Sequence, residues 1–500
     1  MPGKEIPEED GGSQMRLYFS DFFEVSASQL RSYGAFDISL VSDLPLFIDP
    51  FLLFNSRKSQ YRKLHKDIIK YLRFLKRKSA ASHLDPGLIQ SLYRFPEVDQ
   101  NWLGFTAEGN KGRGLGSKFA NTLHRNLHRI FSEFGNENVS RGSHLEKLCL
   151  IDDGVGKDNI SDFTTNLIKR FLLKYTEAFA KRFIHPRLKR RFSVPRVRFI
   201  YGTETWHSQE FVLPCFKDDY VLLTPKDMLA KENTWINRAD LVTDFERLCD
   251  SVSNTELRAK INNYFIRVLP EKATPKQRRN AASETIYHFP KIIDYFIRRK
   301  EQLGREAESI SSRRVKSSET LYHEQFGRLV DLLARQSEFY RNSGRTYDEA
   351  LCRVRFLKDV IENKGGHKIF YVKGQLLQRE SDAHILYRFT WYATPSDVSR
   401  EVNDGRGPAD YKISRGSTDK SIVEFKLASN SQLEKNLQHQ TQIYQKASDA
   451  RKSIKVVLFF SEAEQNRLED ILKRLKLDNK ENVVVIDARD DNKPSGSKAA

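Results

Sequence analysis

Residues 408–428 contain two short runs in which apolar and polar side chains alternate. Such alternation is typical of a β-strand that buries only one face. In the second run, residues 421–428, Glu424 and Lys426 share one face, and the opposite face is apolar. A carboxylate and an ammonium therefore lie next to each other on the polar face of this strand.

A hairpin would bring a second carboxylate to the same place. Asp410 belongs to the first run, on the face opposite to Tyr411 and Ile413. Residues 415–420, between the two runs, have the composition of a hairpin loop. Pairing of the strands would set Asp410 beside Glu424. The sequence thus predicts a sheet that carries two carboxylates and one ammonium on one face.

These side chains have the chemistry of a metal-dependent phosphodiesterase. Carboxylate oxygens suit Mg²⁺ or Mn²⁺, which can activate water, and an ammonium offsets the negative charge of a phosphoryl transition state. The order Asp410, Glu424-Phe425-Lys426 resembles the motif of the PD-(D/E)XK nuclease superfamily. The resemblance covers residues 368–490. It implies a restriction-endonuclease-like α/β core with a mixed central sheet.

A helix-like run after the motif extends this resemblance. Residues 431–434 have capping-box form. Further along, Gln440 and Tyr444 lie one turn apart and share a helix face, and they resemble the QxxxY element of RecB-type and lambda-exonuclease-type nuclease domains. The resemblance implies that this pair positions the scissile phosphate. The remaining elements of such a core follow in order: a strand at 454–460, a helix at 462–475 and a strand at 482–486.

The resemblance also implies roles for the motif residues. Asp410 and Glu424, with the main-chain carbonyl of Phe425, would hold the metal, and Lys426 would orient or help deprotonate the attacking water. By family resemblance, the products would carry 5′-phosphate and 3′-hydroxyl ends.

A superfamily core needs a further carboxylate, and two residues compete for this position. Glu380 begins a helix-like run that extends to Tyr392, a place from which several superfamily members supply an acid. Glu401 lies just before a glycine-rich GRGP segment. Both remain candidates, with a slight preference for Glu380.

Composition indicates the kind of partner. Lys and Arg number 84 against 66 acidic residues, which gives a net charge of +18 and a pI near 9.5. This excess favours a polyanion, and the motif favours nucleic acid, DNA rather than RNA, over a membrane. The sequence has no long apolar run or signal peptide. We therefore expect a cytoplasmic protein. The four cysteines have neither zinc-site nor disulfide-framework spacing: Cys149, Cys215, Cys249 and Cys352.

Two basic segments of the N-terminal half are candidates for nucleic-acid contact. Residues 111–118 form a glycine-rich loop that leads into a helix whose N–H groups could hold a phosphate. Residues 181–198 combine basic groups with aromatic side chains, which could stack on unpaired bases. The candidate contact residues are Lys111, Arg113, Lys118, Arg187, Lys189, Arg190 and Arg191.

The order of these features predicts an α/β multidomain chain. In the N-terminal region, the patterns predict strands at 47–48, 147–151, 197–201, 211–215 and 220–223, and helices at 59–78, 117–134, 160–182 and 238–251. The predicted units are a disordered tail at 1–14, a mixed α/β region of unknown role at 15–290, a helical connector at 291–366, the nuclease domain at 367–488 and a disordered tail at 489–500.

The interpretation that accounts for most of these features is a metal-dependent nuclease acting on DNA. The N-terminal region would serve as a targeting or control module, and a restriction-type or antiviral defence role, with a homo-oligomer or a defence-system partner protein, follows only by analogy. Two alternatives remain open. One is a non-catalytic nucleic-acid-binding or assembly protein that retains the nuclease fold, and the other is a recombination or repair junction resolvase.

Overall fold

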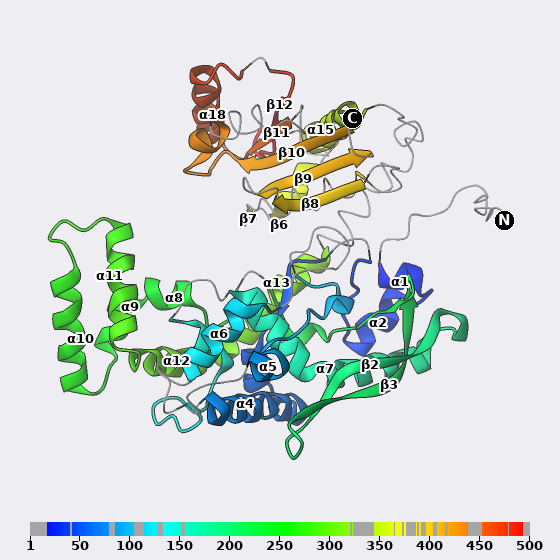
Figure 1. Cartoon of the computed structure of the whole chain (residues 1–500). Coiled ribbons are helices and arrows are strands. Elements are labelled where there is room, and N and C mark those ends of the chain that lie inside the picture. Colours follow the sequence, from blue (N-terminus) through cyan, green and yellow to red (C-terminus); the bar gives the residue numbers. More distant parts are fainter. Residues whose placement is uncertain are drawn as a thin grey trace.

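The structure is a computed structural model of the whole chain (Figure 1). It combines helices and strands in two groups of elements, one formed by residues up to about 320 and one from residue 345 onward. The backbone is described for residues 18–40, 43–79, 86–104, 115–127, 134–151, 156–231, 233–320, 323, 345–364, 366–372, 375–376, 387, 390–391, 397–403, 408–415, 419–438, 453–478 and 480–493.

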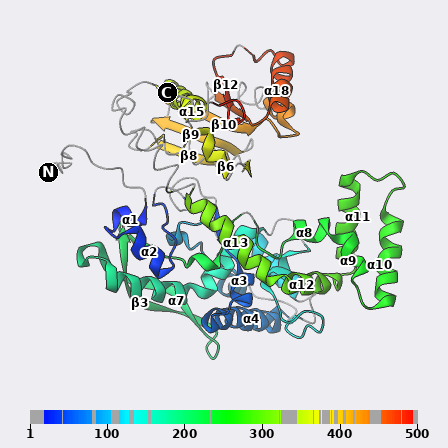
Figure 2. The ribbon, with the colours of Figure 1, turned by 180° about the vertical axis from the view of Figure 1, so that it is seen from behind.

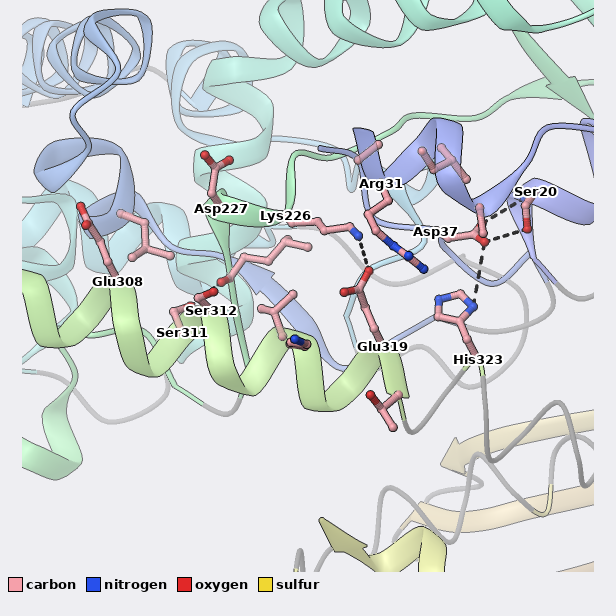
Figure 3. A pocket seen from close by; sticks show the side chains of 18 of the residues that line it. Ser20, Arg31, Asp37, Lys226, Asp227, Glu308, Ser311, Ser312, Glu319 and His323 are labelled. Atoms are coloured by element: carbon pink, nitrogen blue, oxygen red, sulfur yellow. Dashed lines mark hydrogen bonds and ion pairs between the residues drawn. The ribbon is translucent and has the colours of Figure 1, made fainter. Parts of the chain in front are cut away.

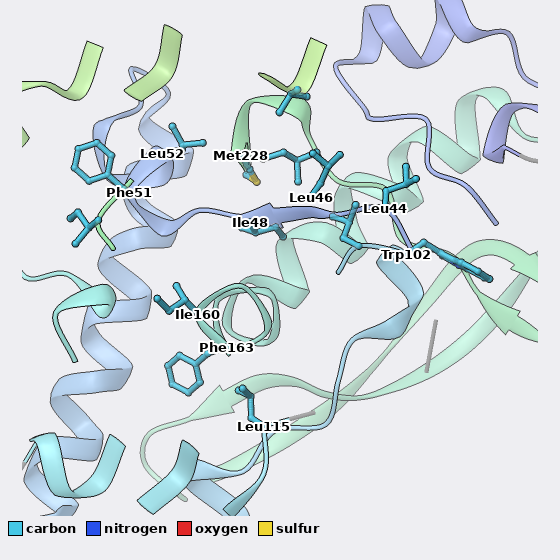
Figure 4. Close-up of a cluster of buried hydrophobic side chains, with 14 of the residues drawn as sticks. Leu44, Leu46, Ile48, Phe51, Leu52, Trp102, Leu115, Ile160, Phe163 and Met228 are labelled. Carbon is cyan, nitrogen blue, oxygen red and sulfur yellow. The ribbon is translucent and has the colours of Figure 1, made fainter. Parts of the chain in front are cut away.

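The core of the N-terminal group forms around two short paired strands. Strand β1 (Leu46–Ile48) is antiparallel to β5 (Leu229–Lys231). Helix α3 (Pro50–Asn55) begins directly after β1, because Asp49 accepts a hydrogen bond from the Phe51 N–H at 2.9 Å and proline suits the first helical position. Helix α7 (Lys157–Phe183) packs against β1. Figure 4 shows the apolar side chains that meet there, among them Leu46, Ile48, Phe51, Leu52, Ile160, Phe163 and Met228.

A long hairpin packs on α7. Strands β2 (Lys189–Ile200) and β3 (Thr205–Phe216) are antiparallel, and β4 (Asp219–Tyr220) extends the sheet. The register shifts between Val194 and Arg198, where Arg196 has a φ of 55°. Such a bulge bends a strand and increases its twist. Val194 and Leu213 are fully buried, so the hairpin has a core of its own against the helix.

Helices form the rest of this group. Helix α4 (Ser59–Ser79) buries Tyr61, Ile68, Leu72 and Leu75, which recur at helical spacing, and ends in three basic residues that complement its dipole. Helix α13 (Gly304–Glu319) packs against β5 and also against α3, next to which it lies in Figure 2. The other α-helices of this group are α1 (Phe19–Phe22), α2 (Ala27–Tyr33), α5 (Pro86–Leu88), α6 (Ser117–Arg125), α8 (Arg238–Thr243), α9 (Phe245–Asp250), α10 (Thr255–Val268), α11 (Pro275–His288) and α12 (Ile292–Gln302).

The C-terminal group contains a mixed five-stranded sheet with the order β12-β11-β10-β9-β8. Strands β8, β9 and β10 are antiparallel neighbours, whereas β10, β11 and β12 are parallel. A separate pair, β6 with β7, precedes the sheet. The bounds are β6 (Tyr371–Val372), β7 (Gln375–Leu376), β8 (Asp397–Asn403), β9 (Pro408–Arg415), β10 (Asp419–Leu427), β11 (Ser453–Phe459) and β12 (Val483–Asp487).

Helices cover both faces of this sheet. Helix α15 (Thr346–Asn363) contacts β9, β10, β11 and β12, and its Val354 shares a core with Phe425. Helix α18 (Glu462–Arg474) packs with Val457 and Phe459, which belong to a separate apolar cluster. Because β10 lies between two strands and under helices, residues 421–425 are all buried, including those on its polar face.

An ionic group fixes α15 to the sheet. The Glu349 carboxylate binds Arg353 at 2.7 Å and Arg415, at the end of β9, at 2.7 Å. The Arg353 guanidinium also donates to the Thr390 carbonyl and lies 4.5 Å from the centre of the Trp391 ring. Glu349 and Arg353 are only 1% and 2% exposed. Burial at this level requires that each charge keep its partner.

The structure confirms the predicted mixed α/β composition and most of the predicted elements. The hairpin of residues 408–428, the strands near 454–460 and 482–486 and the helix near 462–475 are all present. The strand predicted at 147–151 is wrong. Residues 145–149 form a 3-10 helix in which Glu146 and Lys147 are buried, so the local apolar run reflects packing and not a sheet. The helix predicted at 238–251 is two helices, α8 and α9.

Two predicted boundaries differ from what the structure indicates. Helix α15 was assigned to the connector, but its contacts favour a sheet unit that starts at residue 346. The tail predicted from residue 489 begins with ordered residues, since Arg489 and Asn492 both bind Asp487. Residues 1–14 and 494–500 lie outside the described part. Across the helices that are described, none is long and apolar enough to span a membrane.

A buried histidine of α4 gives the N-terminal core a specific pH dependence. His65 is 5% exposed and lies 5.1 Å from the Phe54 ring and 5.5 Å from the His144 ring, measured between ring centres. Burial, with a smaller contribution from His144, lowers the pKa of His65 to about 3. In the unfolded chain, this ring has a pKa of about 6.5. Its contribution to stability is therefore full above that pH and falls as the pH drops toward 3.

We expect the wild type to lose about 2 kcal/mol more unfolding free energy than His65→Phe between pH 7.5 and pH 5. The difference between the two proteins removes the contributions of other titrating groups. Urea unfolding of both proteins at several pH values measures it. Parallel pH profiles would contradict the assignment.

Candidate active site

Strand β10 places Glu424 at the centre of the C-terminal sheet. Glu424 is 2% exposed, and its Cα pairs with that of Lys455 on β11. Lys455 is also buried, at 3% exposure. The carboxylate predicted on the polar face of the strand therefore lies in a partly closed environment beside an ammonium. Charge interactions are stronger there than in water.

The register of β9 brings the second motif carboxylate to the same row. Strands β9 and β10 pair as far as Tyr411 with Val423, so the next position of that register sets Asp410 opposite Glu424. The backbone of the predicted motif thus has the pairing that the sequence indicated. The side chain of Asp410 lies outside the described part of the structure.

Strand β8 adds a third acidic residue to this row. Its pairs with β9 are Arg400 with Tyr411 and Val402 with Ala409, and Glu401 and Asp410 lie between these pairs. The backbone therefore aligns Glu401, Asp410 and Glu424 across three neighbouring strands. The side chain of Glu401 is not among those described, and Glu380 lies wholly outside the described residues. The register supports Glu401 as the further carboxylate, although Glu380 was slightly preferred.

Lys426 lies two residues beyond Glu424 on the same strand. Its ammonium donates a hydrogen bond to the Phe425 carbonyl at 2.7 Å. This is the carbonyl that the sequence analysis assigned to the metal. The contact places the ammonium at that oxygen, and the metal role of the carbonyl remains a prediction. Lys426 is half-buried, so it can be reached from solvent.

Lys455 is a site residue that the sequence pattern did not single out. Its ammonium donates to the Leu437 carbonyl at 3.0 Å, in the helical segment 433–438 that follows β10. Burial lowers the pKa of Lys455, and the neighbouring Glu424 acts in the opposite direction. A lysine within the apolar strand 454–460 was the available signal. Its partner could not be foreseen, because the parallel register of β10 and β11 is not encoded locally.

The helix after β10 begins differently from the prediction. Asn430, not Ser431, accepts the first side-chain hydrogen bond, from the Gln432 N–H at 2.8 Å. The segment that bears Gln440 and Tyr444 lies outside the described residues, so their role remains a prediction. Among the described residues, no group of three His, Cys, Asp or Glu side chains forms a metal site. The Asp410 and Glu401 side chains lie outside that described set.

The basic run of residues 181–198 lies on the end of α7 and on β2. Lys189 donates to the carbonyls of Ala180 and Ile184, at 2.8 and 2.9 Å, and so caps α7. This structural role gives no support to its predicted contact with nucleic acid. Three arginines instead form exposed ion pairs, which are weak in water. The pairs are Arg187 with Glu24 at 2.6 Å, Arg190 with Asp218 at 3.0 Å and Arg191 with Glu210 at 3.1 Å.

The glycine-rich loop falls largely outside the described residues. Lys111 and Arg113 belong to that part, and Lys118 is described only by its backbone, in the first turn of α6. Helix α6 does begin directly after this loop, as predicted, with Gly116 at its N-cap. Phosphate contact by these three residues remains a prediction.

Two separate regions of the chain match known families. Residues 24–237 match a family described as Domain of unknown function (DUF8370). Residues 346–462 match a second family, described as Domain of unknown function (DUF8371), and this match begins at the first residue of α15. No curated protein and no solved structure matches the chain. The second match includes β8 to β11 and therefore all three residues of the aligned row, as well as Lys455 on β11.

Proposed function

We propose that the C-terminal sheet is the catalytic core of a metal-dependent nuclease that hydrolyses phosphodiester bonds, in DNA rather than RNA. The observation that carries the proposal is the alignment of Glu401, Asp410 and Glu424 across three neighbouring strands, with Lys426 on the same strand as Glu424. Opposite residues on adjacent strands lie within contact distance of each other on one face of a sheet. Such a row concentrates carboxylate oxygen next to an ammonium.

The donor set fits Mg²⁺ or Mn²⁺, which prefer oxygen ligands. Asp410 and Glu424 would hold the ion with the Phe425 carbonyl, and Glu401 or Glu380 would complete the set. A bound ion would supply Lewis-acid charge and an activated water at the scissile phosphate. Glu424 is buried, and its carboxylate interacts with the neighbouring Lys455 ammonium.

The chain's own groups have distinct tasks in this reaction. Lys426 would orient the attacking water and, as a neutral amine, help to remove its proton; the ammonium formed in this way would oppose the negative charge that builds on the phosphate. Attack on phosphorus breaks the bond to the 3′ oxygen and leaves a 5′-phosphate. Lys455 joins the site strand to segment 433–438, which leads to Gln440 and Tyr444, through its hydrogen bond to Leu437.

The rest of the chain supports a polyanionic substrate. The net charge of +18 favours DNA, and exposed arginines of β2 could bind its phosphates, since their ion pairs are weak. The N-terminal group would act as a targeting or control module. A cytoplasmic restriction-type or antiviral defence role, with a homo-oligomer or a partner protein of the same system, is our proposal for its context.

The test is a cleavage assay with the full-length protein. We expect plasmid or linear DNA to be cut in Mg²⁺ or Mn²⁺ but not in EDTA, and Lys426→Ala to lose this activity, while the exposed Lys435→Ala retains it. RNA, single-stranded DNA and branched DNA complete the substrate set. The proposal fails if the wild type leaves every substrate intact or if Lys426→Ala cuts at the wild-type rate.

The same assay separates the alternatives. Salt-dependent DNA binding that EDTA does not alter, without cleavage, would favour a non-catalytic binding or assembly protein. A strong preference for branched over linear duplex would favour a junction resolvase. Both alternatives are compatible with the positive charge of the chain.

A further inference from the structure

The N-terminal group contains a cavity of about 1000 Å³ that is remote in sequence from the proposed nuclease site (Figure 3). Helices α1, α2 and α13 line it, together with residues 56–58 between α3 and α4 and the segment that precedes β5. This volume is at the upper end of the range for small-molecule sites, about 300–1,000 Å³. The cavity therefore has room for an organic ligand of nucleotide size.

The cavity is lined by five carboxylates, each of which already has a partner. Asp37 shows this best: it accepts from the Ser20 hydroxyl at 2.7 Å and from the Ser20 N–H at 3.0 Å, and the His323 ring lies 3.9 Å away (Figure 3). The others bind as follows: Asp227 with Lys58 and Tyr61, Glu319 with Lys226, Glu308 with Asn55 and Asp21 with the Tyr18 N–H.

Most of the Lys and Arg side chains that line the cavity lack an acidic partner among the described residues. Lys58 and Lys226 are paired, but Arg31, Arg57 and Lys316 form no ion pair with any described residue. These three come from α2, from the segment before α4 and from α13, so they approach the cavity from different elements. Figure 3 shows Arg31 reaching inward between Lys226 and Asp37. The cavity therefore has cationic hydrogen-bond donors without an acidic partner, and these donors could bind an anion.

Two further features suit a phosphate chain with an organic part. Arg57 lies just before the N-terminus of α4, whose first turn has no acidic residue, so the helix dipole adds to the positive potential. At the other end, the Tyr18 and His323 rings lie 4.3 Å apart, and Leu30 and Val315 also line the wall. An aromatic and apolar wall next to unpaired cations favours a ligand with both kinds of surface.

We propose that this cavity binds a polyphosphate group through Arg31, Arg57 and Lys316. The group belongs either to a nucleotide, whose base would lie against the Tyr18 and His323 end, or to an inorganic polyphosphate. The proposal concerns the N-terminal group alone. It does not depend on whether the C-terminal sheet cleaves nucleic acid.

Isothermal calorimetry with the full-length protein tests this proposal, with ATP and inorganic tripolyphosphate as probes and without divalent metal. We expect saturable binding of one ligand per chain. Equal affinities for the probes would identify the phosphate chain as the whole ligand, and tighter binding of ATP would identify a nucleotide. Each of Arg31→Gln, Arg57→Gln and Lys316→Gln should weaken binding about tenfold, which corresponds to 1.4 kcal/mol. All three side chains are exposed, so the variants should fold.

Arg278→Gln is the matched control, because Arg278 is an exposed arginine on α11 that pairs with Glu246. It should bind the probes as the wild type does. Absence of saturable binding for both probes would overturn the proposal. So would a triple variant of Arg31, Arg57 and Lys316 with wild-type affinity, since binding would then reside elsewhere on this basic chain.

Discussion

Glu424→Gln is expected to reduce Mg²⁺-dependent DNA cleavage by about 10³-fold, a loss typical of removing one group that stabilises transition-state charge. The substitution keeps the shape of the side chain but removes its negative charge. Glu424 is 2% exposed beside Lys455, so water cannot replace that charge, and the neighbouring ammonium would lose its counter-charge. The effect should exceed that of any surface substitution in the domain.

Initial cleavage rates and calorimetric Mg²⁺ binding measure this effect separately. The control is Glu469→Gln on the exposed side of α18, which should leave both quantities unchanged. Circular dichroism checks that the Glu424 variant is folded. Wild-type rates in a folded Glu424→Gln protein would remove Glu424 from the active site.

The same measurements identify which residue supplies the further carboxylate. The backbone register sets Glu401 opposite Asp410, so Glu401→Gln should weaken Mg²⁺ binding more than Glu380→Gln does. A larger effect of Glu380→Gln would restore the preference drawn from the sequence. Equal, small effects would mean that Asp410 and Glu424 hold the ion without a further carboxylate.

Glu349→Leu is expected to destabilise the C-terminal sheet unit by about 3–5 kcal/mol, because it leaves a buried guanidinium without its counter-charge. Arg353 is 2% exposed and takes its ion pair from Glu349, and Arg415 would lose the same partner. Since a typical domain is stable by only about 5–15 kcal/mol, this loss should open the unit at moderate urea.

Hydrogen exchange of peptides from α15 and β10 reports this unit separately from the N-terminal group. The control is Glu481→Leu, because the Glu481–Arg355 pair is exposed on both sides and should contribute little. The double variant Glu349→Leu, Arg353→Met should recover part of the loss. A change below about 1 kcal/mol for Glu349→Leu would show that the ionic group is not required.

The sequence alone was sufficient to predict those elements whose structure depends on residues that are close together in the chain. Period-two alternation located β9 and β10, and their register is the one that places Asp410 against Glu424. Helical periodicity located α4, α7 and α18 to within a few residues. These elements follow from patterns within about 20 residues, in which one face is apolar.

Local rules failed where a distant partner supplied the hydrogen bond. Residues 346–349 have capping-box form, but Asp419 of β10 accepts from the Thr346 N–H at 3.0 Å, and Glu349 turns instead toward two arginines. The burial of Glu424 has the same origin. The alternation of apolar and polar residues predicted which side chains share a face of β10. The residues that bury this face, however, are distant from it in the sequence.

The mixed sheet has a consequence for the order in which the site assembles. β9 and β10 are separated by only three residues of the chain, so Asp410 and Glu424 can meet as soon as this hairpin closes, an event of about 1–10 μs in isolated hairpins. β11 joins β10 in parallel only after a longer crossover, which has a higher closure cost. Until Lys455 arrives, the two acidic groups would repel each other. The docking of β11 therefore both extends the sheet and relieves that repulsion.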